Sequence, residues 1–99
     1  MDYIKTTSNG VELNRWKKFT KKQQLLAIGS EFMRAKNWQN KDRENFLSAL
    51  ERAFELIDLA LADEKWKNNL LMLLELRNEV AKFYTSERTD DISFLYNSL

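Results

Sequence analysis

The 99-residue sequence contains no cysteine, no histidine and no proline, and it has only two glycines. Without cysteine, the chain has no disulfide, no thiolate nucleophile and no thiolate-bound zinc or iron–sulfur cluster. Without histidine, it lacks the commonest general base and metal ligand, which excludes Ser-His-Asp triads and helix-borne histidine zinc sites. We therefore expect a non-catalytic protein that holds no cofactor.

Long apolar runs are also absent. The longest one extends from Leu70 to Leu74, whereas a membrane-spanning helix needs about 20 apolar residues. The first residues, Met1 to Lys5, lack the basic segment followed by an apolar run that marks a secretory signal. We expect a cytoplasmic protein that is not associated with a membrane.

The scarcity of glycine and proline removes the turn signals that all-β folds require. Hydrophobic residues make up 43% of the chain, enough for one compact core at this length. Their spacing predicts an all-α fold: an up-down-up bundle of three main helices over 21–38, 42–62 and 64–84. Short flanking helices are expected at the N- and C-terminal ends, and residues 20–99 are expected to form a single bundle domain.

Polar residues mark where the helices begin. Thr20 and Gln23 form a capping box for the first main helix, Asn40 or Asp42 caps the second, and Asp63 caps the third. Thr89 with the two aspartates after it starts the short C-terminal helix.

Residues 1–19 form a basic and aromatic segment that is expected to pack on the bundle. Asn9 is a candidate cap for a short helix that places Leu13 and Trp16 on one face. Val11 and Leu13 would also fit an extended segment, so both alternatives stay open.

Charge is divided unevenly between the two halves of the chain. Residues 1–41 hold nine basic and three acidic residues, a net charge of +6, and residues 42–99 hold seven and twelve, a net charge of −5. The strongest basic cluster interleaves cations with aromatic rings, a pattern typical of nucleic-acid binding and, less often, of membrane surfaces. It consists of Arg15, Trp16, Lys17, Lys18, Lys21 and Lys22. A solvated or internally paired basic face is the ordinary interpretation, because the second half of the chain is acidic enough to repel a polyanion.

Acidic side chains on the second and third helices suggest a weaker hypothesis. Glu51 with Glu55, and Glu75 with Glu79, are spaced four apart, and two such pairs on antiparallel helices could hold Mg²⁺ for phosphate chemistry. The Glu51 and Glu55 side of the second helix faces away from its apolar stripe, however. A solvated acidic face is therefore the ordinary interpretation here too.

Arg77 is placed by helical periodicity in the middle of the apolar stripe of the third helix, in line with Trp66 and Tyr84. A buried guanidinium needs a carboxylate or several carbonyls. We expect a structural ion pair inside the bundle, with Glu31 or Asp58. The alternative is that Arg77 reaches an anionic ligand in a cleft.

The leading functional hypothesis is a protein–protein interaction module, with a homodimer as one form of it. Its support is an excess of apolar side chains over what one neighbouring helix would cover. Two of them, Trp38 and Leu59, lie off the stripes of their own helices. On the third helix Met72, Leu76 and Phe83 widen the stripe, and Leu71 lies apart from it. A nucleic-acid-associated regulatory protein using residues 15–22 is the alternative, and a Mg²⁺-dependent enzyme is the weakest.

Overall fold

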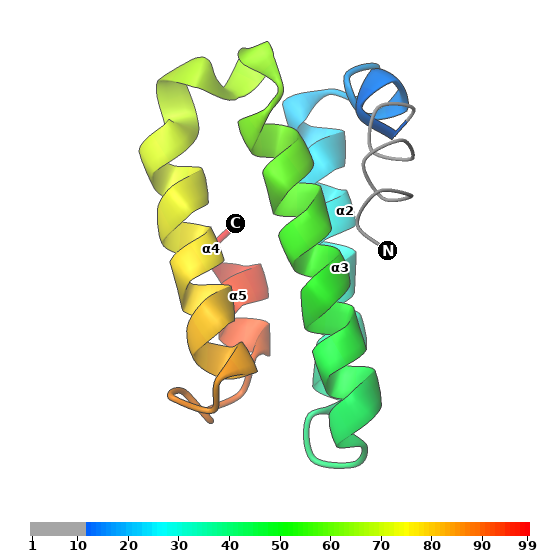
Figure 1. Cartoon of the computed structure of the whole chain (residues 1–99), viewed down its shortest axis with the longest axis vertical. Helices are drawn as coiled ribbons and strands as arrows, with labels where there is room; N and C mark the ends of the chain where they lie inside the picture. The colour runs from blue at the N-terminus through cyan, green and yellow to red at the C-terminus, as the bar shows by residue number, and fades with distance from the viewer. Residues whose placement is uncertain (1–11) are drawn as a thin grey trace.

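The computed structural model describes residues 12–99, which fold into helices joined by short connections (Figure 1). After a helical turn over residues 12–16, the elements are α2 (Lys21–Trp38), α3 (Arg43–Leu61), the 3₁₀ helix η1 (Glu64–Asn69), α4 (Leu70–Tyr84) and α5 (Ser93–Asn97). The three long helices alternate in direction, and the short ones flank them. The predicted all-α bundle of three main helices is therefore confirmed.

The helices begin at the polar residues that the sequence indicates. The Thr20 hydroxyl accepts a hydrogen bond from the Gln23 amide at 3.1 Å, and the Gln23 side chain accepts one from the Thr20 amide at 2.9 Å. Asp42 rather than Asn40 caps α3, and Asp63 caps η1. Each cap satisfies an amide that the helix itself leaves unpaired. The Asn9 cap lies outside the described residues.

The core forms around α3, which packs against both α2 and α4. This helix carries fully buried side chains on both sides, including Ala49 and Ala53, whose small size lets the neighbouring helices approach closely. The short connection from Gln39 to Asp42 turns the chain directly from α2 into α3. α2 contributes Ile28, Phe32 and Ala35 to the same core.

The predicted third helix, 64–84, is divided into two elements. Residues 64–69 form η1, and the α-helix begins only at Leu70. A 3₁₀ helix turns by about 120° per residue and an α-helix by about 100°, so Trp66 does not indicate which side of α4 faces the core. The buried side chains of α4 are Leu73, Leu76, Val80 and Phe83. Arg77 lies beside this stripe and not within it.

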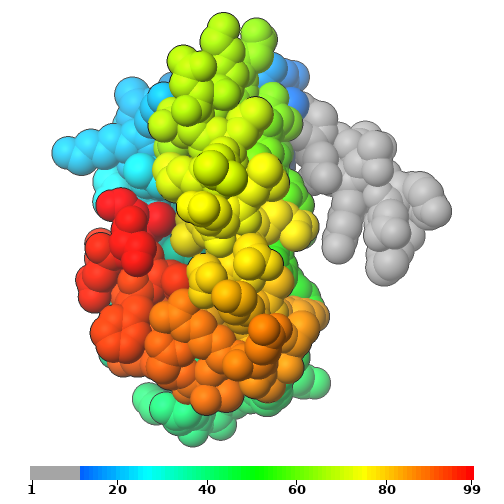
Figure 2. Space-filling view, turned by 90° about the vertical axis from the view of Figure 1, so that its left-hand side faces the viewer, coloured from blue at the N-terminus to red at the C-terminus, as the bar shows by residue number. Residues whose placement is uncertain are grey.

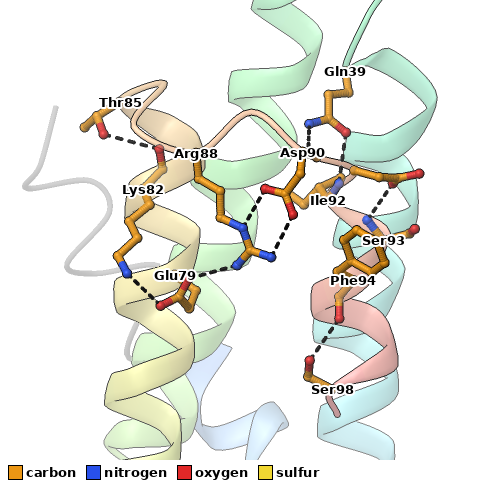
Figure 3. Close-up of polar contacts among 11 residues, drawn as sticks. Gln39, Glu79, Lys82, Thr85, Arg88, Asp90, Ile92, Ser93, Phe94 and Ser98 are labelled. Carbon is orange, nitrogen blue, oxygen red and sulfur yellow. Dashed lines mark hydrogen bonds and ion pairs between the residues drawn. The ribbon is translucent and has the colours of Figure 1, made fainter.

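Residues 85–92 carry the chain from α4 to α5 along the end of α2 (Figure 3). Ser86 ends α4 in the left-handed conformation, with φ 66°. Gln39 at the end of α2 donates a hydrogen bond to the Asp90 carbonyl at 2.6 Å and accepts one from the Ile92 amide at 3.0 Å. Arg88 bonds Asp90 at 2.7 Å and Glu79 at 2.8 Å. These contacts hold the start of α5 against the bundle.

The carboxylates of this connection are stabilised in their charged form. The hydrogen bond from Arg88 lowers the pKa of Asp90, and hydrogen bonds from Lys82 and then Arg88 lower the pKa of Glu79. Lys36 and the backbone amide of Ser93 bind Asp91 and lower its pKa to about 2. The positive partners therefore come from α2, α4 and the connection itself.

Residues 12–19 are attached to the bundle by a buried polar network. The Gln24 side chain of α2 is fully buried, and its amide nitrogen donates hydrogen bonds to the Trp16 carbonyl and to Asp63, both at 2.9 Å. Its oxygen accepts a hydrogen bond from the Trp66 indole. Burial raises the pKa of Asp63, but hydrogen bonds from Lys65 and Gln24 outweigh burial, and the net shift is downward.

None of the helices in residues 12–99 combines the length and apolar character needed to cross a membrane.

Candidate functional site

One face of the molecule exposes apolar side chains from three helices. In Figure 2, α4 runs down the middle of this face with α5 beside it. We define the apolar face by the exposed apolar side chains that line its two pockets: Leu26, Met72, Tyr96 and Leu99. Next to Met72 on α4, Leu71 is 70% exposed, although it lies in the most apolar stretch of the chain. Exposed side chains of this kind, gathered on one surface, indicate an interaction site.

The apolar face is hollowed on both sides of Leu99. A pocket of about 500 Å³ between α4 and α5 is lined by Met72, Glu75 and Leu99, among others. A smaller pocket of about 260 Å³ between α2 and α5 is lined by Lys22, Leu26, Tyr96 and Leu99. The two pockets share Leu99, so the apolar face is continuous, with Lys22 at one side and Glu75 at the other.

Cations gather at the end of the bundle where α2 begins and η1 lies (Figure 1). We call this the basic end, and its members are Arg15, Lys17, Lys18, Lys21, Lys22, Lys65 and Lys67. Lys65 and Lys21 join its two segments, because Lys65 donates to the Lys17 carbonyl at 2.9 Å and Lys21 to Asn69 at 2.8 Å. The structure therefore extends the predicted basic cluster with two lysines that are distant in the sequence.

A third pocket, of about 470 Å³, opens beside the basic end. Arg15, Trp16 and Phe19 line it from the N-terminal segment, and Leu59 lines it from α3. Phe19 is 44% exposed and contacts the Trp16 ring edge-on, with ring centroids 6.2 Å apart. Trp16 itself is only 4% exposed, and within residues 12–99 its indole nitrogen has no hydrogen-bond partner.

The structure separates the apolar residues predicted to contact a partner into two groups. Trp38 and Met72 are exposed, as a contact surface requires. The other three are in the core, with exposed fractions of 7% for Leu59, 8% for Leu76 and 1% for Phe83. Their expected position on an exposed surface is therefore wrong, although Leu59 and Leu76 line pockets at their inner sides. The exposed apolar side chains of α4 are Leu70, Leu71, Met72 and Leu74.

Arg77 forms the expected ion pair with Asp58, at 2.8 Å, but the pair lies at the surface. Both side chains are about half exposed, and the guanidinium also stacks over the Phe54 ring, 4.9 Å from its centroid. The hydrogen bond from Asp58 raises the pKa of Arg77. The expected position inside the bundle is wrong because η1 interrupts the α-helical periodicity from which it was inferred. No described pocket is lined by Arg77.

The acidic residues proposed for Mg²⁺ are not assembled into one site. Glu51 accepts a hydrogen bond from the Tyr84 hydroxyl at 2.8 Å, and this bond raises the pKa of Tyr84. Glu55 pairs with Arg52 at 2.9 Å, and Glu79 pairs with Lys82 and Arg88. Within residues 12–99, no three acidic side chains are grouped so that they could hold a metal ion.

The fold and these surfaces define a small all-helical bundle with an apolar face and a basic end. Comparison of the chain with protein-family models, with curated proteins and with solved structures finds no match in any of the three. The functional argument therefore depends on the surfaces themselves.

Proposed function

We propose that the protein is an interaction module that self-associates, with the apolar face of one copy packing against the same face of a second copy. The observation that carries this proposal is the exposure of Met72, Tyr96 and Leu99 around two pockets that share Leu99. Side chains of this size gain free energy when they leave water, at about 25 cal/mol for each Å² buried. A second copy would supply the apolar surface that this face lacks.

The charges around the apolar face favour a second copy of this chain as the partner. Lys22 borders the pocket on one side of Leu99, and Glu75 borders the pocket on the other side. A two-fold axis through Leu99 would bring Lys22 of each copy toward Glu75 of the other, because such an interface pairs each patch with its own image. Neither side chain has an ion-pair partner within residues 12–99.

A dimer interface would need only a small part of the surface of this chain. A standard interface takes about 800 Å² from each partner. That area is about one eighth of the accessible surface of this chain, 6418 Å². The charged residues at the edge of the face would form the polar rim that such interfaces have.

The experiment is sedimentation equilibrium of the full chain over a hundredfold range of concentration. We expect a reversible monomer–dimer equilibrium, and we expect Met72→Glu to shift it to monomer, because Met72 lines a pocket of the apolar face and a carboxylate there would be buried in the interface. Trp38→Glu is the matched control, since Trp38 is also exposed but lies at the other end of α2. A wild-type chain that stays monomeric at every concentration would contradict self-association.

A charge exchange tests the two-fold arrangement itself. Lys22→Glu and Glu75→Lys should each weaken the dimer, since each brings like charges together across the interface. The double variant Lys22→Glu/Glu75→Lys should restore the dimer, because the opposite charges face each other again. If the double variant is weaker than both single variants, the two residues do not meet across a two-fold axis.

A further inference from the structure

The basic end carries more positive charge than the folding of the chain explains. Of its seven cations, only Lys65 forms an ion pair with a carboxylate in the described part of the chain, with Asp63 at 2.6 Å. The first turn of α2 contains Lys21 and Lys22 and no acidic residue. Cations at this position are unfavourable, because the first turn is the positive end of the helix dipole.

The acidic half of the chain does not cancel this charge. The carboxylates of α3 nearest to the basic end are Asp58 and Glu55, and each is paired with an arginine, Arg77 and Arg52 respectively. Asp63 is buried and engaged with Lys65 and Gln24, and Glu64 lies in the first turn of η1. Seven cations against these two carboxylates leave the basic end electropositive.

An exposed aromatic ring lies among these cations. Phe19 follows Lys18 directly, and its ring is held in place by the edge-on contact with the buried Trp16. Arg15 and Phe19 also line the pocket beside the basic end. A ring held beside lysines provides a surface on which an unpaired base can stack while the cations contact its phosphates.

We propose that the basic end binds single-stranded nucleic acid, with phosphates on Lys17, Lys18 and Lys67 and a base stacked on Phe19. A membrane surface is less well matched, because Trp16 and Trp66 are buried and Phe19 alone among the described aromatic rings of this end is exposed, which leaves little apolar surface to enter lipid. The proposal is independent of self-association, since the apolar face lies along α4 and α5. Lys22 borders both surfaces and is therefore left unchanged in the tests below.

Fluorescence anisotropy with a labelled oligothymidine of about a dozen nucleotides tests the proposal. Each phosphate contact to a single strand lowers the logarithm of the affinity by about 0.7 per tenfold rise in salt. Three such contacts predict a loss of roughly twentyfold between about 50 and 200 mM salt. Absence of binding at the lower salt concentration would overturn the proposal.

Variants locate the binding surface. Lys18→Glu and Lys67→Glu should each weaken binding and reduce the salt dependence, whereas Lys41→Glu, the same charge change at the opposite end of α2, should have little effect. If Lys41→Glu weakens binding as much as Lys18→Glu, the attraction is due to overall charge and no binding surface exists at the basic end.

Variants of Phe19 test whether the ligand of the basic end is a single strand, a duplex or a lipid surface. Phe19→Ala should weaken single-strand binding about tenfold through loss of stacking and leave duplex binding nearly unchanged, while Phe19→Tyr should keep the affinity. Thermal melting of both variants controls for folding. Binding to vesicles with anionic lipid, without binding to the oligonucleotide, would overturn the proposal in favour of a membrane surface.

Discussion

Gln24 is a polar side chain at the centre of an otherwise apolar contact. It is fully buried and makes hydrogen bonds with Trp16, Asp63 and Trp66. These partners belong to two segments outside α2, residues 12–19 and η1 with its cap. Gln24 lies one helical turn before Ile28, so the α-helical periodicity places it on the buried side of α2. This spacing could have predicted that the Gln24 side chain is buried. The composition alone did not single it out, because glutamines are usually exposed.

Gln24→Leu should lower the free energy of unfolding by about 2–4 kcal/mol. The substitution is similar in size, but it leaves the Trp66 indole, Asp63 and the Trp16 carbonyl without their partner, and each unsatisfied buried group costs about 1–3 kcal/mol. Urea unfolding measures the loss, with Ser30→Ala, an exposed change on the same helix, as the control. An unchanged urea midpoint would show that the network does not stabilise the fold.

Arg77→Met should lower the free energy of unfolding by less than about 1 kcal/mol. The Arg77–Asp58 pair is about half exposed, and exposed ion pairs contribute roughly 0–1 kcal/mol because water and salt screen them. The apolar stem of methionine keeps part of the contact with Phe54. A loss of several kcal/mol in urea unfolding would contradict the surface position of this pair.

At the scale of elements, the short α5 is held by contacts of the connection before it and by its own buried side chains. Gln39 and Lys36 of α2 bind the connection, and Ile92 and Leu95 are buried. At Gly29 the α2 backbone meets the Tyr96 ring: a β-carbon there would lie 2.8 Å from two ring carbons and 3.1 Å from a Leu99 methyl carbon. The missing side chain of Gly29 therefore makes room for α5.

Gly29→Ala should destabilise the wild-type chain but stabilise a chain that already carries Tyr96→Ala. In the wild-type chain the added methyl group displaces the Tyr96 ring and destabilises the fold. In a Tyr96→Ala chain the same change should stabilise by up to about 1 kcal/mol, because alanine favours a helix over glycine. Urea unfolding at low protein concentration, where self-association is negligible, measures both values. The same effect in both backgrounds would show that α5 does not pack on Gly29.

At the scale of the whole molecule, the free energy of unfolding should change with pH more strongly in acid than near neutral pH. The pKa values of Asp63, Glu79, Asp90 and Asp91 are all lowered in the folded chain. A carboxylate with a lowered folded pKa stabilises the fold above its unfolded value and loses that contribution as the pH falls through the folded value. With no histidine in the sequence, no side chain with an ordinary pKa changes charge between about pH 5.5 and 8.

The free energy of unfolding should therefore fall as the pH drops from about 4.5 toward 2. The upper limit follows from the ordinary glutamate value of 4.5, which applies to Glu79 in the unfolded chain, and the lower from the pKa of Asp91, about 2. Asp91→Asn should flatten this acid limb, measured by urea unfolding from neutral pH to pH 2. An acid limb with the same slope in both proteins would mean that Asp91 does not contribute to it.

Features that depend on neighbours in the chain were determined by the sequence alone. The limits of α2 and the caps at Thr20 and Asp63 follow from hydrogen bonds within a few residues, which any helical chain of this sequence would make. The cap of α3 was limited to Asn40 or Asp42. The basic segment at residues 15–22 is equally local. The α-helical periodicity was reliable over α2 and over most of α3, but it placed Leu59 off the buried stripe, whereas Leu59 is buried.

Features that depend on contacts between distant residues were decided by the tertiary structure. The change from 3₁₀ to α-helix at Leu70 rotates α4, so that Leu76 and Phe83 enter the core while Leu71 stays exposed and Arg77 reaches Asp58 at the surface. The addition of Lys65 and Lys67 to the basic end, and the burial of Gln24 and Trp16, likewise arise from packing. The physical reason is that burial and charge clustering depend on where helices meet, whereas caps and periodicity depend only on adjacent residues.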